Sequence, residues 1–528
     1  MRRQLALLVA ILALYAVVLG RTVTFDFVWD DVHEIANNPA FERPLAEGLL
    51  ATQTERTDPT LTELPTIQLA YDSFRPLVFA SLWVDCQLWG RAPAPLHATN
   101  LVLGAIAILL AYVLARRWLG GTAALVPTAV FALHPIQIEA VAYISGRADL
   151  LAGLFALLAC HAGLRASDEQ PRPRVIGWLA VAALGFACSL LAKEAYIGLP
   201  VVVAAALVAG GSLRARWWIP VALAGVAAAY LGVRAALVTA TSGQALGAAI
   251  LDLPGVWLEY LRIVVLPFDL STERLRHPAF VVPGLVITVL LVVAAVVAHR
   301  RGGVPRELRV AAFGLVWMAV LVAPASVAVH GNGVVADRYF YAPLFGLALA
   351  LTALARQAIA HRRSLARPLA AAGALAALLW LAVAWRQVLV WRDNATLYAH
   401  AVEMTPESSM AQYRVGYLLA QAGAWPDAID RFEAAVTRDP DNVLALNNLG
   451  VGLLRTGQPA RAETPLAHAV EVNPAYFRAW LNLGLARWEA GDRARGCEAI
   501  ERALAINPGY AAAAVERQRR CASSPRAP

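Results

Sequence analysis

Long apolar runs constrain the fold of this 528-residue chain more than any other feature of its sequence. The chain is 59% hydrophobic and only 16% charged, and a soluble domain of this size could not bury that much apolar surface. A helix of about 20 apolar residues crosses the hydrocarbon core of a bilayer. We therefore expect an all-α membrane domain with about eleven transmembrane helices, at approximately residues 5–20, 97–115, 122–134, 149–164, 175–192, 195–211, 217–236, 279–298, 310–329, 338–355 and 367–386.

The distribution of arginine predicts the orientation of these helices. The first run follows "MRRQ" and has the length of a signal peptide, but no A-x-A-like cleavage site precedes Arg21, so we expect an uncleaved first helix. Arginines fill alternate connections, which the positive-inside rule places in the cytoplasm. The C-terminal third and two long loops, at about 21–96 and 237–278, then lie outside the cytoplasm. This predicts a bacterial inner-membrane protein with periplasmic repeats, or an endoplasmic reticulum protein in a eukaryote.

The charge and the cysteines exclude some classes of partner. The net charge of +8 is explained by cytoplasmic arginine, and no basic stripe with interleaved aromatic residues predicts a nucleic acid partner. The five cysteines have no metal-ligand spacing, and we predict no metal site, although the acids could hold a divalent ion. Cys497 and Cys521 could form a disulfide in an extracytoplasmic domain, or remain two free thiols.

A 34-residue period marks the C-terminal third of the chain. Proline recurs at this interval from Pro406 to Pro508, and glycine and alanine recur in three further registers. Small residues where paired helices touch, with proline at the repeat end, are the signature of tetratricopeptide repeats. We predict a membrane domain over 1–390 and a repeat α-solenoid over 391–528, with full repeats at about 409–442, 443–476 and 477–510.

Two adjacent carboxylates, Asp30 and Asp31, follow the first apolar run. Taken alone, such a pair is most simply a turn or a helix cap. On the outer membrane surface, beside Phe25, Phe27 and Trp29, the pair lies where a lipid-borne substrate would present its head group. One carboxylate could act as general base toward a hydroxyl acceptor, and the second would raise its basicity and orient the acceptor.

Three further charged clusters fall in short connections on the same predicted face. The segment "HPIQIEAVAYISGRADLL" is either a loop network between helices or part of a site, because polar residues at membrane depth usually face a cavity. Lys193, the chain's one lysine, is either a snorkelling residue or a phosphate ligand. Asp337 and Arg338 are either an ion pair or a phosphate site. For a joint site we assign phosphate binding to Lys193, Arg338 and Arg147, and support to His134, Glu139, Asp149 and Glu194.

Several stretches resemble one known family. "FVWDDVHEIANNP", "SFRPLVFASLWVDCQLWG", "ALHPIQIEAVAYISGRADLLAGLF", "LLAKEAYIGLP" and "VADRYFYAPL", followed by the repeats, resemble the transmembrane-and-tetratricopeptide-repeat O-mannosyltransferase-like proteins. The resemblance implies a GT-C membrane fold, a polyprenyl-phosphate-linked sugar donor (typically mannose) and a catalytic acid pair, which maps onto Asp30 and Asp31. One departure is Asp337, where the family's pattern has glutamate.

These observations together predict a membrane glycosyltransferase that moves a sugar to a hydroxyl acceptor, such as Ser or Thr of a protein, on the non-cytoplasmic face. Asn448 and Asn482, 34 residues apart, are predicted to line the concave face of the repeats and bind an acceptor peptide. One alternative is a non-catalytic membrane scaffold whose repeats recruit a partner protein. A second is a lipid-phosphate or sugar transporter, which would call for charges within spans and internal pseudo-symmetry.

Overall fold

The fold was analysed in a computed structural model, which describes residues 2–49, 74–168, 172–237, 244–272, 274–275, 278–284, 304–332 and 334–521. Within these ranges the chain is helical, and its one β feature is an isolated bridge between Leu275 and Val334. The chain forms two compact units, one within residues 1–396 and one within 397–528. The predicted all-α class is therefore confirmed.

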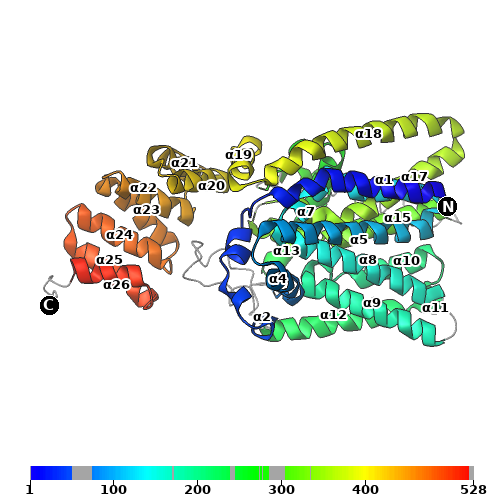
Figure 1. Cartoon of the computed structure of the whole chain (residues 1–528), viewed down its shortest axis with the longest axis horizontal. Helices are drawn as coiled ribbons and strands as arrows, with labels where there is room; N and C mark the ends of the chain where they lie inside the picture. Colours follow the sequence, from blue (N-terminus) through cyan, green and yellow to red (C-terminus); the bar gives the residue numbers. More distant parts are fainter. Residues whose placement is uncertain are drawn as a thin grey trace. The chain divides into compact units, whose positions relative to one another are not determined.

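Unit one is a bundle of long apolar helices, several of which run side by side in Figure 1. Eight of the described helices are long and apolar enough to span a membrane, and a ninth span is possible if a pair bent by 53° at His134 counts as one. The principal helices are α1 (Arg2–Leu19), α4 (Pro76–Trp89), α5 (Pro93–Leu119), α6 (Leu125–Leu133), α7 (Ile138–Ala142), α8 (Arg147–Asp168), α9 (Arg172–Ala192), α10 (Leu199–Ala209), α12 (Trp218–Leu237), α13 (Gln244–Val265), α15 (Arg306–Val322), α16 (Ala325–Asn332), α17 (Tyr341–His361) and α18 (Ala366–Gln387).

The predicted count of eleven spans is not confirmed. The run at 122–134 is the first arm of the bent pair, and the run at 195–211 is a short apolar helix. Most of the run at 279–298 lies outside the described residues. The eight remaining predicted runs coincide with the eight span-length helices, because runs near 20 apolar residues fix a spanning helix by length alone.

Helix α8 is the central element of the bundle, since 72% of its most apolar window is buried, against 6% for the helix that contains α18. Close helix contacts are made through small residues, as is common between membrane helices. A side chain at Gly314 of α15 would clash with the carbonyl of Gly346 in α17, and the reverse also holds. Helices α15 and α17 therefore pack backbone to backbone at these two glycines.

Unit two consists of helix pairs with the predicted 34-residue period. The first helices of each pair are α20 (Ser409–Gln421), α22 (Val443–Arg455) and α24 (Phe477–Glu489), and the second are α21 (Trp425–Arg438), α23 (Pro459–Val472) and α25 (Arg493–Ile506), with α19 (Asn394–Met404) before them and α26 (Ala511–Arg520) after them. Each second helix ends two residues before the repeated proline, because proline cannot continue the helix. The turns within pairs contain glycines with positive φ, at 423, 457 and 491.

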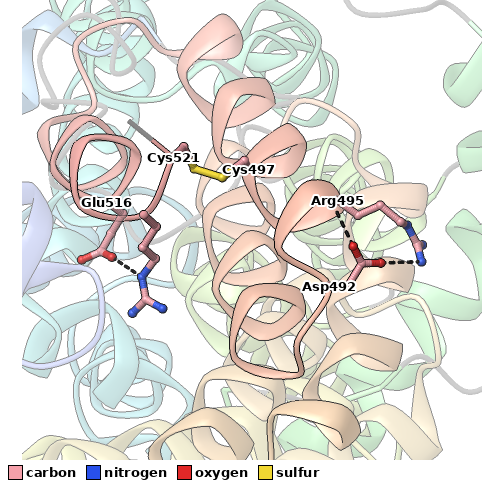
Figure 2. Close-up of a disulfide and its surroundings, with 6 residues drawn as sticks. Asp492, Arg495, Cys497, Glu516 and Cys521 are labelled. Carbon is pink, nitrogen blue, oxygen red and sulfur yellow. Dashed lines mark hydrogen bonds and ion pairs between the residues drawn. A yellow bond between two sulfur atoms is a disulfide. The ribbon is translucent and has the colours of Figure 1, made fainter. Parts of the chain in front are cut away.

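A disulfide joins the last two helices of unit two. Cys497 of α25 and Cys521 after α26 are bonded, with 5.6 Å between their Cα atoms (Figure 2). Of the two states left open by the sequence, the structure contains the bonded one. Disulfides persist in oxidising compartments, so this bond is consistent with an extracytoplasmic repeat unit.

Candidate active site

The second acid of the pair anchors a loop. Asp31 is fully buried, and its Oδ1 accepts hydrogen bonds from the backbone N–H of Ser145 at 2.8 Å and from the Ser145 hydroxyl at 2.7 Å. Its Oδ2 accepts a bond from the N–H of Ile144 at 3.3 Å. Burial raises the pKa of Asp31 to about 7, although these bonds act in the opposite direction. Asp31 therefore ties the first loop to the connection between α7 and α8.

Asp30 is the more accessible acid. Its side chain is half-buried, and its Oδ2 accepts a hydrogen bond from the Tyr143 hydroxyl at 3.1 Å. Its other carboxylate oxygen receives no hydrogen bond from any residue that the structure describes. The pair thus divides into a buried anchor and a half-buried carboxylate with one oxygen that no described residue occupies, as a general base requires.

The residue before Asp30 has a strained backbone. Trp29 has φ of 55°, and it is the one non-glycine residue with positive φ in the described part of the chain. Such a conformation is costly for a bulky residue and persists only where its surroundings hold it. The N–H of Trp29 donates to Oδ1 of Asn394 at 2.7 Å, and its ring stacks on Tyr143 with centroids 5.4 Å apart. The hydrogen bond to Asn394 and the stacking on Tyr143 therefore stabilise the strained conformation of Trp29, directly before the candidate base.

Arg338 faces the same aromatic rings. Its guanidinium carbon lies 5.4 Å from the ring centroid of Trp29, 5.8 Å from that of Tyr143 and 5.1 Å from that of Tyr339. The guanidinium forms an ion pair with Glu139, whose Oε2 also accepts from the backbone N–H of Arg338 at 3.1 Å. Tyr143 is thus shared between the cation of Arg338 and the carboxylate of Asp30.

Lys193 lies over the ring of Tyr339, as Arg338 does. Its Nζ donates to the two oxygens of Asp149 at 2.6 and 2.8 Å and lies 4.5 Å from the Tyr339 ring centroid. Lys193 and Arg338 therefore contact one ring, although the chain separates them by 145 residues (338 − 193). The structure brings together Asp30, Asp31, Glu139, Asp149, Lys193 and Arg338 from five separate segments.

Arg75, at the start of α4, is a third cation that the sequence did not single out. It pairs with Glu194 at 3.4 Å, and about a third of each side chain is exposed (31% and 35%). The charges of Glu194, Asp149 and Glu34 all raise the pKa of Arg75, against the effect of burial. Arg75 is therefore joined to the segment of Lys193 through Glu194. The sequence signal for Arg75 was its position in the "SFRPL" stretch quoted above, directly before α4.

Arg147 lies apart from these cations. Its side chain is fully buried, and its Nη1 pairs with Asp85 at 2.6 Å. Its other nitrogens donate to Oδ1 of Asn100 and to the carbonyl of Leu96, at 2.8 and 2.9 Å. Because all three nitrogens of this guanidinium donate hydrogen bonds to residues of the protein, the side chain joins the segments that carry those residues. The phosphate-binding role assigned to Arg147 does not fit this geometry.

His134 and Asp337 also have partners within the fold. Nδ1 of His134 accepts from the N–H of Ile136 at 3.1 Å, so the protonated Nε2 donates to the carbonyl of Val264 at 3.0 Å. Asp337 pairs with the buried Arg274 at 2.5 Å. Both residues therefore hold parts of the fold together. The alternative ion pair between Asp337 and Arg338 is not formed, because Asp337 pairs with Arg274 and Arg338 pairs with Glu139.

The two repeat asparagines occupy equivalent, half-buried positions in α22 and α24. Nδ2 of Asn448 donates to the carbonyl of Leu444 at 3.0 Å, and Nδ2 of Asn482 donates to Oδ1 of Asn447 at 2.8 Å. Asn482 thus links two successive repeats. Peptide binding by these residues stays a prediction. Over the described ranges, no three His, Cys, Asp or Glu side chains come together as a metal site.

The fold and the clustered charges define a polytopic helical membrane protein with a C-terminal repeat domain. The family model for "Tetratricopeptide repeat" matches residues 391–443 and 447–511. The chain is 35% identical to the human "Protein O-mannosyl-transferase TMTC1" over 158 residues, which cover 28% of this chain and 17% of that protein. It is 24% identical to the Caenorhabditis elegans "Protein O-mannosyl-transferase F38B6.6" over 430 residues, which cover 75% of this chain and 58% of that protein.

The resemblance that the sequence motifs carry, to the transmembrane-and-tetratricopeptide-repeat O-mannosyltransferase-like proteins, is confirmed by these relatives. The matched segments span less than two thirds of the length of either relative. Among solved structures, "First TPR of Spaghetti (RPAP3) bound to HSP90 peptide SRMEEVD" is 23% identical, with a TM-score of 0.21, and covers 22% of this chain and 91% of that chain.

Proposed function

We propose that this protein is a membrane glycosyltransferase that moves a sugar, typically mannose, from a polyprenyl-phosphate donor to a hydroxyl acceptor on the non-cytoplasmic face. The observation that carries the proposal is the arrangement around Tyr143. The half-buried carboxylate of Asp30 accepts a hydrogen bond from the Tyr143 hydroxyl, and the guanidinium of Arg338 lies over the ring of the same residue. A base beside a phosphate-binding cation is what transfer of a group from a phosphate requires.

The proposed reaction uses the residues at the loop end of unit one. The open oxygen of Asp30 takes the proton of the acceptor hydroxyl, and the acceptor oxygen forms a bond to the anomeric carbon. The bond between that carbon and the phosphate oxygen breaks, and its electron pair stays on the phosphate. Arg338 and Lys193 stabilise the developing charge, with Arg75 as a further cation. Because no second nucleophile enters this scheme, inversion at the anomeric carbon is expected.

Asp31 is a positioning residue in this scheme. Its two oxygens are occupied by Ser145 and Ile144, so it cannot also accept the acceptor proton without losing the loop contact. Its role is to hold the turn that presents Asp30. Glu139 and Asp149 hold Arg338 and Lys193 in place, and a bound phosphate would share these cations with them.

The acceptor class rests on the repeats and on the relatives. Tetratricopeptide repeats commonly bind extended peptides on their concave face, and both relatives are named protein O-mannosyltransferases. We propose a protein acceptor bound by unit two, with Asn448 and Asn482 as contacts.

The experiment that tests the donor class uses membranes containing the full chain. Labelled polyprenyl-phosphate mannose and polyprenyl-phosphate glucose are supplied in turn, and labelled products are identified by mass spectrometry. Transfer of label to protein from either lipid donor supports the proposal. Transfer from a nucleotide sugar in place of the lipid donors would contradict it, and transport of unreacted donor would favour a transporter.

A non-catalytic scaffold is the main rival function. It predicts that Asp30→Asn leaves cellular function intact, whereas deletion of residues 391–528 abolishes it. The glycosyltransferase proposal predicts loss of function in both cases.

A further inference from the structure

An apolar groove runs between the first and the last long helices of unit one. Leu14, Val17 and Val18 of α1 line one wall, and α18 forms the other with Leu378, Leu381 and Trp385. The groove has a volume of about 410 Å³, within the roughly 300–1,000 Å³ range of small-molecule sites. The two helices lie side by side along one edge of the bundle (Figure 1). Both have span-length apolar sequences, so the groove faces the hydrocarbon of the bilayer.

Two cations mark one end of this groove. Arg386 is part of its lining and is exposed, and no described acidic residue pairs with it. Arg21, one turn beyond Val18, lies over the Trp385 ring at 4.3 Å and donates to the Trp385 carbonyl at 3.0 Å. An apolar groove that ends in arginines is complementary to a lipid with an apolar chain and an anionic head group. On the predicted topology these arginines lie on the outer side, where the positive-inside rule expects few.

A series of bonds leads from this end of the groove to Asp30. After Arg21 and Trp385, the N–H of Asp26 donates to the carbonyl of Arg392 at 3.0 Å. Three residues later the N–H of Trp29 donates to Asn394. The segments that leave α1 and α18 thus stay joined up to the residue before Asp30. An anionic head group bound at Arg21 and Arg386 would therefore lie at the start of the segment that carries the candidate base.

We propose that this groove binds the chain of a long-chain isoprenoid monophosphate, with Arg21 and Arg386 at its phosphate end. The site would hold the lipid carrier of the sugar before its phosphate reaches Arg338 and Lys193, and to that extent it rests on the proposed function. The weak burial of the helix that contains α18, at 6% of its window, leaves the groove open along its length to a chain entering from the bilayer.

The binding test uses the purified full chain in nanodiscs and a photoreactive polyprenyl monophosphate. Peptides of α1 and α18 are expected to be labelled, and excess unlabelled polyprenyl phosphate should compete, whereas phosphatidylglycerol at the same excess should not. Arg386→Gln should weaken this labelling about tenfold, since one charge-assisted contact is lost. Labelling outside α1 and α18, or equal competition by phosphatidylglycerol, would overturn the proposal.

A kinetic test distinguishes binding of the donor chain in this groove from the transfer reaction itself. Val17→Trp and Ala382→Trp fill the groove from exposed positions, and Leu375→Trp, on α18 but outside the groove lining, is the matched control. The filled variants should raise KM about tenfold for a long-chain donor and leave transfer from a two-isoprene donor unchanged. If the filled variants have the wild-type KM for the long-chain donor, the proposed groove is refuted, whereas the proposed glycosyltransferase activity is not affected. Absence of transfer from any lipid donor in the wild type would refute the glycosyltransferase, and photolabelling would still test the groove.

Discussion

The backbone N–H of Trp29 donates a hydrogen bond to Oδ1 of Asn394 across 365 residues of chain, at 2.7 Å. This bond holds the one bulky residue of positive φ in the described chain, directly before Asp30. We expect Asn394→Ala to lower kcat about tenfold with little change in KM, because the strained turn would relax and move the carboxylate of Asp30. Transfer kinetics with saturating donor measure this effect.

Two further variants check that the bond itself is responsible. Asn394→Asp keeps an acceptor oxygen and should restore most of the rate. Asn37→Ala removes an exposed asparagine from the same loop and should behave as wild type. Equal loss of rate in all three variants would point to general damage of the loop.

Burial of Asp31 makes the stability of unit one depend on pH. Its pKa of about 7 lies above the usual value of 3.8, so the folded protein keeps a proton that the unfolded chain has released. This contribution to stability is full below pH about 4 and is lost as the pH rises to about 7. Wild type should lose more apparent Tm than Asp31→Asn over this interval, by an amount equivalent to a few kcal/mol. Parallel pH profiles for the two proteins in detergent would contradict the assignment.

Arg338 is expected to stabilise the departing phosphate through its planar guanidinium. Arg338→Lys keeps the positive charge beside Glu139 but loses the fork, so kcat should fall about 10- to 100-fold while the fold is retained. Arg214→Lys, in the short helix α11 (Leu213–Arg216), supplies the control for the same chemical change. An unchanged kcat in Arg338→Lys, with Arg214→Lys also unchanged, would remove Arg338 from the reaction.

The disulfide between Cys497 and Cys521 closes a loop of 24 residues and should stabilise the last helix pair by about 3 kcal/mol. Reduction, or the variant Cys521→Ser, should therefore expose α26 to proteolysis before the earlier repeats.

The disulfide between Cys497 and Cys521 also tests whether the repeats lie in an oxidising compartment. Maleimide labelling of whole cells should modify neither cysteine until a reductant is added, whereas labelling without reductant would show that the bond is absent in the cell.

The repeats and the long spans could be predicted from the sequence because each depends on a local pattern. The proline period fixed α21, α23 and α25 to within two residues of their ends. The site was predictable only in part. The charged residues stand out in apolar sequence, but their partners lie far along the chain: Ser145 is 114 residues from Asp31. The partners of Arg147 were not predicted. Asp85 and Asn100 contact its guanidinium from distant parts of the chain, and no local sequence pattern indicates these contacts.

The central claim is that Asp30 is the general base, and one comparison tests it most directly. Asp30→Asn removes the base, and Asp26→Asn makes the same change at an exposed aspartate four residues earlier. Sugar transfer by the two purified variants is measured with the lipid donor under identical conditions, after matched thermal unfolding curves establish that both are folded. We predict a loss of at least about 100-fold in Asp30→Asn and wild-type transfer in Asp26→Asn. Wild-type transfer by folded Asp30→Asn would contradict the account.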